Sequence, residues 1–301
     1  MKGFDFMAKI LPFTGSGVAI VTPFDGYKTN YDELGRLIDM NIENGTDAII
    51  ICGTTGEAST MPDAEHLAAI EYTVKKVNGR VPVIAGTGSN ETAHAVELSK
   101  KAEELGADGL LQVTPYYNKA SAKGLIAHFT AVAEAVSIPV ILYNVPSRTG
   151  VNIPIPVLKE LAKLPNIVAI KEASGNISYT AKIAAEVPEL YIYSGNDDMI
   201  IPVLSLGGKG VISVLANVMP QETHDMCQAF FDGDTEKAKE MQLKYLDLID
   251  SLFIEVNPIP VKTALGLMGY NVGNLRLPLI DMEEKNLETL KDSMRAVGLI
   301  K

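Results

Sequence analysis

Cysteine is scarce in this chain, which has only Cys52 and Cys227 among its 301 residues. Two thiols are too few for a disulfide framework, and a reducing compartment fits them best. Basic residues are outnumbered, because 26 Lys and Arg stand against 37 Asp and Glu, for a net charge of −11. This balance argues against nucleic acid and against an anionic membrane surface as partners.

Long apolar runs are also absent. No stretch approaches the roughly 20 apolar residues of a membrane span, and residues 1–9 lack the continuous apolar segment of a signal peptide. We therefore expect a cytoplasmic protein. The histidines have no metal-ligand spacing, the cysteines do not complete a zinc site, and there is no Walker P-loop or flavin motif. We expect neither a metal nor a cofactor.

What the chain does contain is a series of short runs rich in Val and Ile, mostly without polar alternation. This pattern is typical of parallel strands buried on both faces. The predicted strands are residues 18–24, 48–53, 81–86, 109–115, 139–145, 167–173, 190–195 and 210–214. Amphipathic segments with helix-start signals or glycine stops lie between them, at residues 32–44, 62–77, 92–105, 122–136 and 177–187.

Eight strands alternating with helices predict an α/β fold of the (β/α)8 TIM-barrel type. An open doubly wound sheet also alternates, but it usually carries a glycine-rich fingerprint after its first strand, and none follows here. After residue 214 the pattern is only helical, at residues 221–231, 235–253, 260–268 and 287–296. We predict a barrel over residues 1–232 and a helical C-terminal extension, packed on it, over residues 233–301.

Lys171 stands out because it lies inside the apolar run of the sixth predicted strand. Lysine is rarely buried without a partner, and burial disfavours the ammonium form of a lysine side chain. A neutral amine is a nucleophile for carbonyls and can form a Schiff base. The simpler alternative is a lysine at a strand end whose ammonium reaches water or pairs with Glu172.

The carboxyl ends of the strands form the active-site mouth of such a barrel. The segments expected there are residues 53–57, 114–118, 143–150 and 194–198, together with Lys171. Hydroxyls, one arginine and one lysine would therefore converge, which favours catalysis. Each has a simpler alternative: a tight turn at 53–57, a core tyrosine at Tyr143, a solvated charge at Arg148, and a helix N-terminus at Asp197.

Three features together resemble the dihydrodipicolinate synthase/N-acetylneuraminate lyase family. They are Gly-Thr-Thr-Gly-Glu at residues 53–57, Tyr-Asn-Val-Pro-Ser-Arg-Thr-Gly at residues 143–150, and the strand lysine Lys171. Order and spacing agree, and the resemblance covers essentially the whole chain. It implies a barrel enzyme in which pyruvate forms an imine with Lys171. The derived enamine then attacks aspartate-4-semialdehyde, a step of diaminopimelate and lysine biosynthesis.

The resemblance also implies the catalytic roles. Lys171 would be the nucleophile, and Tyr143 would move protons to and from the imine. A phenol does this poorly alone near neutral pH, so it needs a hydrogen-bonded relay. In the family this relay comes from Thr54 or Thr55 and from a tyrosine of a neighbouring subunit, which matches Tyr117. Self-association as a dimer or a dimer of dimers is implied in turn.

Substrate contacts follow from the same resemblance. Thr54 and Thr55 would hold the pyruvate carboxylate, and Gly195 and Ile212 would line the pyruvate pocket. Arg148 would bind the carboxylate of aspartate-4-semialdehyde, because a guanidinium can grip a carboxylate with two hydrogen bonds.

Two other functions stay open at this point. Some sugar-acid aldolases keep much of this pattern, although N-acetylneuraminate lyases typically lack an arginine at position 148 and carry Ser-Thr in place of Thr54-Thr55. A barrel that binds a keto acid without turnover is the alternative of another class. Binding alone would not need the proton relay of Tyr143 and Tyr117.

Inhibition by lysine is a separate question. Family members that lysine inhibits bind it at the tight dimer interface, and the residues here that match that site are His66, Asn90 and Tyr116. The residues that depart from it are Ala58, Asp63 and His94. Because His94 replaces an acidic partner of the lysine ammonium, we expect weak or absent inhibition.

Overall fold

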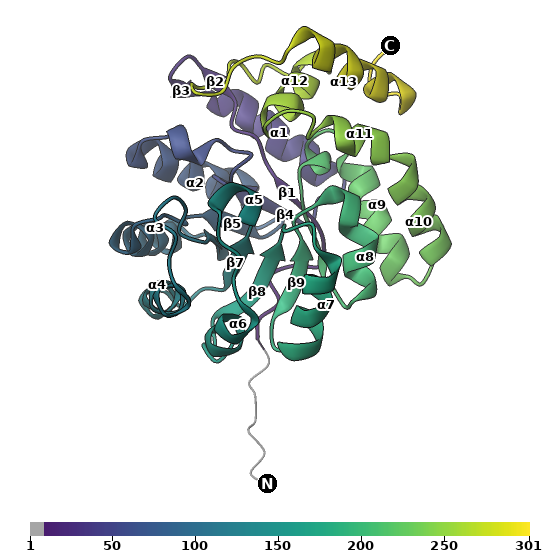
Figure 1. Ribbon diagram of the computed structural model, residues 1–301. Helices are drawn as coiled ribbons and strands as arrows, with labels where there is room; N and C mark the ends of the chain where they lie inside the picture. Colours follow the sequence, from purple (N-terminus) through teal and green to yellow (C-terminus); the bar gives the residue numbers. More distant parts are fainter. Residues whose placement is uncertain (1–8) are drawn as a thin grey trace.

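The computed structural model describes residues 9–301. Parallel strands close into a barrel in the order β1-β10-β9-β8-β7-β6-β5-β4, and helices surround it (Figure 1). The predicted (β/α)8 fold is therefore confirmed. The barrel strands are β1 (Gly15–Ala19), β4 (Ala48–Ile51), β5 (Val83–Gly86), β6 (Gly109–Val113), β7 (Val140–Asn144), β8 (Ile167–Glu172), β9 (Tyr191–Ser194) and β10 (Gly210–Ser213).

The helices that follow the barrel strands agree with the predicted segments to within two residues, where a segment was predicted. They are α1 (Tyr31–Glu43), α2 (Asp63–Val77), α3 (Thr92–Glu104), α4 (Ala122–Ala135), α6 (Ile155–Leu161), α7 (Ile177–Glu186), α8 (Ile200–Ser205) and α9 (Pro220–Phe231). The helices α6 and α8 were not predicted from the sequence. Both are too short to show a helical period, and each has a proline within its first turn.

The first predicted strand, residues 18–24, was wrong in its bounds. The barrel strand β1 starts earlier, and residues Phe24–Asp25 form β2, which pairs with β3 (Lys28–Thr29) in a separate two-stranded sheet. Glycines explain the error. A Cβ on Gly210 would lie 1.9 Å from the carbonyl oxygen of Gly15, so β1 and β10 pair here only because residue 210 lacks a side chain. In the sequence such a stretch resembles a turn.

Beyond α9 the chain continues through α10 (Thr235–Lys244), α11 (Leu246–Ser251), α12 (Ile259–Leu267) and α13 (Glu284–Ala296). The predicted helix over residues 235–253 is broken at Tyr245, whose ψ of 4° leaves the helical range. Apolar residues keep helical spacing across this break, so periodicity alone did not detect it. The helical extension is present (Figure 1), while its boundary at residue 233 stays a prediction.

Aromatic side chains fill the amino end of the barrel. Phe13, just before β1, stacks on Tyr193 with 4.4 Å between ring centroids, and the Tyr193 hydroxyl donates to the Phe13 carbonyl. Lys9 donates to main-chain carbonyls between the end of α6 and the first residue of β8. These contacts fix the segment before β1 against β9 and the start of β8.

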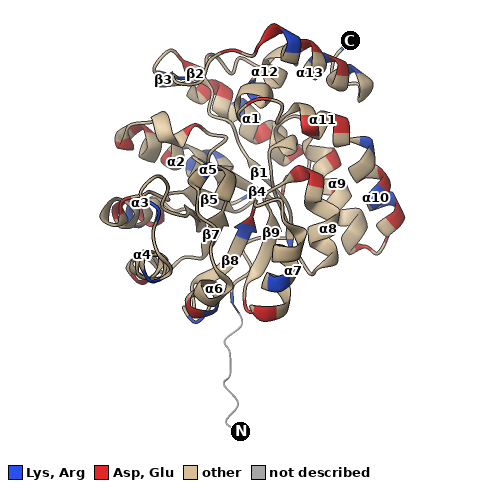
Figure 2. Ribbon diagram, viewed as in Figure 1, with Lys and Arg blue, Asp and Glu red and all other residues tan. Residues whose placement is uncertain are grey.

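Charged residues lie mostly on the outer helices, and the barrel strands carry little charge apart from β8 (Figure 2). Among residues 9–301 no helix is both long and apolar enough to cross a membrane. Within the same range no three His, Cys, Asp or Glu side chains are grouped as metal ligands. The expectation about a signal peptide concerns residues 1–9, of which only Lys9 belongs to the described residues.

A buried ion network holds the C-terminal extension against the turn after β4. The Lys262 ammonium of α12 donates to the Glu57 carboxylate at 2.8 Å, and their side chains are 2% and 1% exposed. The Arg276 guanidinium makes two hydrogen bonds of 2.7 Å to Glu65, and its backbone N–H donates to Glu57. Burial lowers the pKa of Lys262, and the Glu57 carboxylate opposes this shift. The extension is therefore fixed beside the mouth.

The close approach of β1 and β10 predicts a strong effect of one methyl group. Gly210→Ala should destabilise the protein by more than about 2 kcal/mol, because the new Cβ meets the main chain of Gly15. Gly266→Ala is the matched control. A Cβ at this position of α12 would have nothing within 4 Å, so the change should stabilise the protein by about 0.5–1 kcal/mol. Urea unfolding measures both, and equal midpoints would contradict the argument.

The ion network predicts a second effect. Lys262→Met leaves the buried Glu57 carboxylate without its ammonium, and should cost about 3–5 kcal/mol in free energy of unfolding. The double variant Lys262→Met with Glu57→Gln should lose less, because no unpaired charge remains. Thermal and urea unfolding compare the two. A single variant as stable as the wild type would show that the pair is not part of what holds α12.

Candidate active site

Lys171 lies near the carboxyl end of β8, beside Tyr143 of β7. The two are register partners in adjacent parallel strands. The Lys171 Nζ atom lies 4.4 Å from the centroid of the Tyr143 ring. Both residues are buried, at 6% and 7% exposure. The barrel therefore holds a buried amine against a tyrosine ring.

Glu172 does not pair with Lys171. Successive side chains of a strand point to opposite faces, and the Glu172 carboxylate accepts from Asn144 Nδ2 and from the Ser174 N–H, each at 2.7 Å. Burial raises the pKa of Glu172, and these hydrogen bonds oppose the rise. The simpler interpretation, in which Glu172 neutralises the lysine, is not supported.

Gly195 leaves the space that Lys171 uses. A Cβ at Gly195 would lie 3.1 Å from Lys171 Cε and 2.6 Å from the Ala173 Cβ. Any larger residue would displace the lysine or the strand end. Ile212 of β10 is 1% exposed and packs in the same inner layer as Tyr143. Gly195 therefore lies beside Lys171, and Ile212 belongs to the same buried cluster as Tyr143.

The turn after β4 brings the two threonines to this mouth. Thr54 lines the cavity described below, while Thr55 is 3% exposed and its hydroxyl oxygen accepts from Asn257 Nδ2 at 3.0 Å. Cys52, just before the turn, has a φ of +55°, which is uncommon outside glycine. The segment is a tight turn, as the simpler interpretation held, but a turn that also presents hydroxyls.

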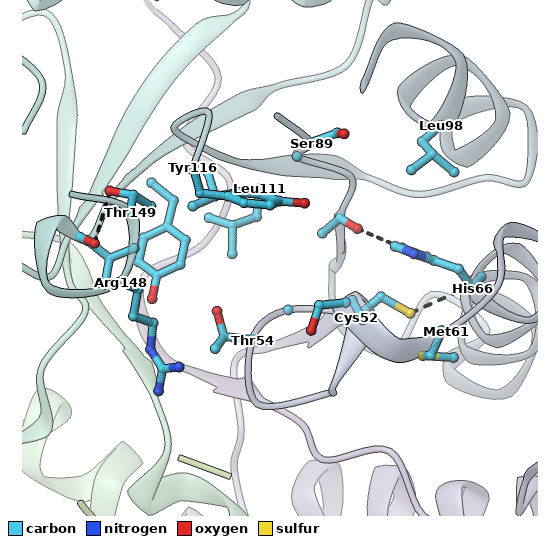
Figure 3. Close-up of a pocket in the computed structure, with 18 of the residues that line it drawn as sticks. Cys52, Thr54, Met61, His66, Ser89, Leu98, Leu111, Tyr116, Arg148 and Thr149 are labelled. Atoms are coloured by element: carbon cyan, nitrogen blue, oxygen red, sulfur yellow. Dashed lines mark hydrogen bonds between the residues drawn. The ribbon is translucent and has the colours of Figure 1, made fainter. Parts of the chain in front are cut away.

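A cavity of about 340 Å³ opens beside these residues. Thr54 and Arg148 lie at one end of it, and Met61, His66 and Leu98 lie toward the other (Figure 3). Tyr143 also lines the cavity. The cavity thus joins the catalytic mouth to the region of α2 and α3.

Arg148 belongs to the short helix α5 (Pro146–Thr149), directly after β7. Its Nη2 donates to the main-chain carbonyl of Asn257 at 3.0 Å, and the side chain lines the cavity. A guanidinium has five N–H donors. One contact therefore orients the guanidinium and leaves its other donors free for a carboxylate. A solvated charge on a loop, the simpler alternative, would not be oriented in this way.

Tyr117 is the predicted residue that the single chain does not bring to the cluster. It lies between β6 and α4 and is 91% exposed. Its φ of +70° is unusual for a tyrosine, as is the +45° of Lys119 in the same loop. The loop therefore holds the Tyr117 ring outward, away from Lys171 of the same chain.

The far end of the cavity carries the residues that depart from the lysine-inhibited pattern. The His94 Nε2 lies 3.0 and 3.1 Å from the Asp63 carboxylate oxygens, and its Nδ1 lies 3.1 Å from Ser89 Oγ. His66 Nε2 lies 2.8 Å from the Gly86 carbonyl, and burial lowers the pKa of His66. Both ring nitrogens of His94 thus have partners within the chain.

Asp197 begins a 3-10 helix, η2 (Asp197–Met199), as the helix N-terminus interpretation predicted. Its carboxylate accepts from the N–H groups of Val214 and Leu215 at 2.9 and 3.0 Å. Burial raises the pKa of Asp197. The residue ties the end of β9 to the end of β10 beneath the mouth.

Asn257 is the residue at the mouth that sequence analysis missed. It lies between α11 and α12, is 5% exposed, and contacts both Thr55 and Arg148. The sequence around it shows only an asparagine before Pro258. This pair predicts a turn, but it does not predict where in the fold the turn lies. No pattern in the C-terminal extension indicated that it reaches the mouth.

Known proteins resemble the chain over nearly all of its length. The profile of the Dihydrodipicolinate synthetase family matches residues 12–297. The 4-hydroxy-tetrahydrodipicolinate synthase of Caldicellulosiruptor bescii is 62% identical over 288 residues, which cover 95% of this chain and 98% of that protein.

Solved structures agree. Dihydrodipicolinate synthase from Aquifex aeolicus has a TM-score of 0.94 and 45% identity, over 95% of this chain and 99% of that one. The enzyme from Cyanidioschyzon merolae, solved with lysine bound, has a TM-score of 0.93 and 43% identity, over 96% and 99%. The resemblance of the three motifs is therefore confirmed, and the chain belongs to the dihydrodipicolinate synthetase family.

Proposed function

We propose that this protein is a 4-hydroxy-tetrahydrodipicolinate synthase, which condenses pyruvate with aspartate-4-semialdehyde. The observation that carries this proposal is the buried Lys171 amine, 4.4 Å from the Tyr143 ring, whose neighbour Glu172 is engaged by Asn144 instead. An amine in this position can attack a keto group. The names of relatives that are 57–63% identical support the same activity.

The first half of the reaction uses the strand residues. The Lys171 nitrogen attacks the keto carbon of pyruvate, and loss of water leaves an imine. A proton then leaves the pyruvate methyl group to give an enamine. Tyr143 carries these protons in this proposal, which the contact between its ring and the Lys171 side chain supports. The Thr54 and Thr55 hydroxyls hold the pyruvate carboxylate, and Gly195 keeps the space around the amine open.

The second half forms the carbon–carbon bond. The enamine carbon attacks the aldehyde of aspartate-4-semialdehyde, whose carboxylate is held by Arg148. The amino group of the bound adduct then attacks the imine carbon, which closes the ring and releases the Lys171 amine. Arg148 lines the cavity and is already oriented by Asn257, so the second substrate meets a fixed anchor.

Tyr117 completes the relay from a second subunit in this proposal. Its 91% exposure and positive φ support a role outside its own chain, since a strained outward tyrosine is costly without a contact. The protein then works as a dimer or a dimer of dimers. We also place it in the cytoplasm, because both cysteines are free and buried, as suits a reducing compartment.

Trapping of the imine tests the proposal. Incubation with pyruvate and borohydride should add one reduced pyruvate unit at Lys171, detected by mass spectrometry and peptide mapping. Lys171→Ala should give no adduct. Lys159→Ala, an exposed helix lysine, is the control and should label like the wild type. An adduct elsewhere, or none, would defeat every Schiff-base function for this chain.

The second substrate separates the proposal from its alternative, a 2-keto sugar-acid aldolase. Turnover should require aspartate-4-semialdehyde, and sugar acids should not be cleaved. The observation that favours the first is Arg148, held at the cavity by Asn257. Cleavage of a sugar acid with no product from the semialdehyde would establish the alternative. Adduct formation without any turnover would instead indicate a keto-acid-binding barrel.

The His94–Asp63 contact predicts the response to lysine. The effector ammonium would meet an imidazole that is already bound to Asp63, so half-inhibition should need more than about 1 mM lysine. His94→Glu should lower that concentration. Thr289→Glu, on α13, adds the same charge elsewhere and should not. Initial rates against lysine concentration measure this, and half-inhibition of the wild type by sub-millimolar lysine would refute it.

A further inference from the structure

Asn257 connects two side chains that serve different substrates. Its Nδ2 donates to the Thr55 hydroxyl oxygen at 3.0 Å, and its main-chain carbonyl accepts from Arg148 Nη2 at 3.0 Å. Thr55 and Arg148 follow different strands, β4 and β7. A single residue from the C-terminal extension therefore touches both halves of the proposed site.

The direction of the Thr55 hydrogen bond matters for chemistry. A threonine hydroxyl has one donor hydrogen and two acceptor lone pairs. When Asn257 donates to the oxygen, one lone pair is occupied and the hydrogen stays available to donate. A carboxylate and a phenolate are both acceptors, so a Thr55 hydroxyl held this way can serve pyruvate or the relay to Tyr143. Without the amide, nothing among the described contacts of Thr55 sets this direction.

The other end of the Asn257 amide is unsatisfied. Its Oδ1 is buried and has no hydrogen-bond partner among residues 9–301. A buried acceptor without a partner is unfavourable, and an apolar residue of similar size would avoid that cost. Among the described contacts, the one hydrogen bond of the Asn257 amide is therefore the one that its donor end makes to Thr55.

The position of Asn257 is set by its neighbours. It precedes α12, and α12 is held on the turn after β4 by the buried Lys262–Glu57 pair. That same turn carries Thr55. The donor and the hydroxyl are thus attached to two segments that an ion pair fixes to each other, which limits how far the hydrogen bond can drift.

We propose that Asn257 is a positioning residue of the active site, which directs the Thr55 hydroxyl with its side chain and the Arg148 guanidinium with its carbonyl. It sets the distance between the Thr55 hydroxyl, which binds pyruvate, and the Arg148 guanidinium, which binds the second substrate. The inference rests on the proposed function, because only a two-substrate reaction needs these groups in fixed relation. Asn257 itself does not touch the reacting atoms.

Substitutions at Asn257 separate its side-chain contact with Thr55 from its main-chain contact with Arg148. Asn257→Ala removes the amide but keeps the carbonyl that holds Arg148. The KM for pyruvate should rise and kcat should fall, together by about 10-fold in kcat/KM for pyruvate, while the KM for aspartate-4-semialdehyde changes by less than about 3-fold. Thermal stability should be kept, since the unpaired Oδ1 is lost with the amide.

Asn257→Asp adds a readout that packing alone does not produce. The carboxylate can only accept, so it takes the Thr55 hydrogen and places a negative charge beside the pyruvate grip. Activity should fall by about 100-fold at about pH 8 and recover in part as the pH is lowered, because the protonated carboxyl can again donate. The wild-type profile should show no such recovery.

Asn166→Ala is the matched control. Asn166 also makes two side-chain hydrogen bonds, to the carbonyls of Ala133 and Val136, but it precedes β8 at the amino end of the barrel. Its loss should lower the unfolding temperature and leave both KM values and the pH profile unchanged. A double variant completes the test: in a Thr55→Val background, Asn257→Ala should have little further effect.

The outcomes distinguish the two proposals. If wild-type protein forms no pyruvate adduct at Lys171, the proposed function is wrong. If the wild type is active but Asn257→Ala keeps kcat and both KM values within about 2-fold, the positioning role is wrong and the function stands. Equal effects of Asn257→Ala in the wild-type and Thr55→Val backgrounds would also overturn the role.

Discussion

The contact between the Lys171 amine and the Tyr143 ring depends on the parallel register of β7 and β8. Those two strands pair residue by residue from Ile141 to Asn144, which puts both side chains on the inner face at the same height. A shift by one residue would turn one of them outward. Every other group of the site is arranged around this pair. Glu172, one residue on, faces the other way and is satisfied by Asn144, so it does not neutralise the amine.

A second constraint places the substrate-binding groups. Strand ends carry Lys171 and Tyr143, whereas Thr55 and Arg148 are hydrogen-bonded to Asn257, which lies more than a hundred residues further along the chain. The buried Lys262–Glu57 pair keeps that segment in place. In the proposed mechanism the C-terminal helices therefore contribute to the active site, because Asn257 contacts Thr55 and Arg148 from that part of the chain.

The barrel and the position of Lys171 could be predicted because each produces a pattern within a short stretch of sequence. Val- and Ile-rich runs give the strands, and a charge inside one of them gives Lys171. Failures occur where the determining contact is distant. The start of β1 depends on how closely Gly15 approaches Gly210, and the role of Asn257 depends on packing between segments far apart in the sequence. Short helices such as α6 and α8 fail for a different reason, since they offer too few residues to show a period.

The placement of the site residues also divides the chemistry by structural element. Lys171 and Tyr143 lie on strands of the closed sheet, where neighbouring hydrogen bonds fix the backbone. Arg148 lies on a four-residue helix and Asn257 in a connection between helices. In the proposed mechanism imine formation therefore uses residues of the barrel sheet, and choice of the second substrate uses residues outside it, which can change without altering the sheet. In a barrel of this kind the imine-forming lysine can stay the same while the second substrate changes, because imine formation and binding of the second substrate use different structural elements.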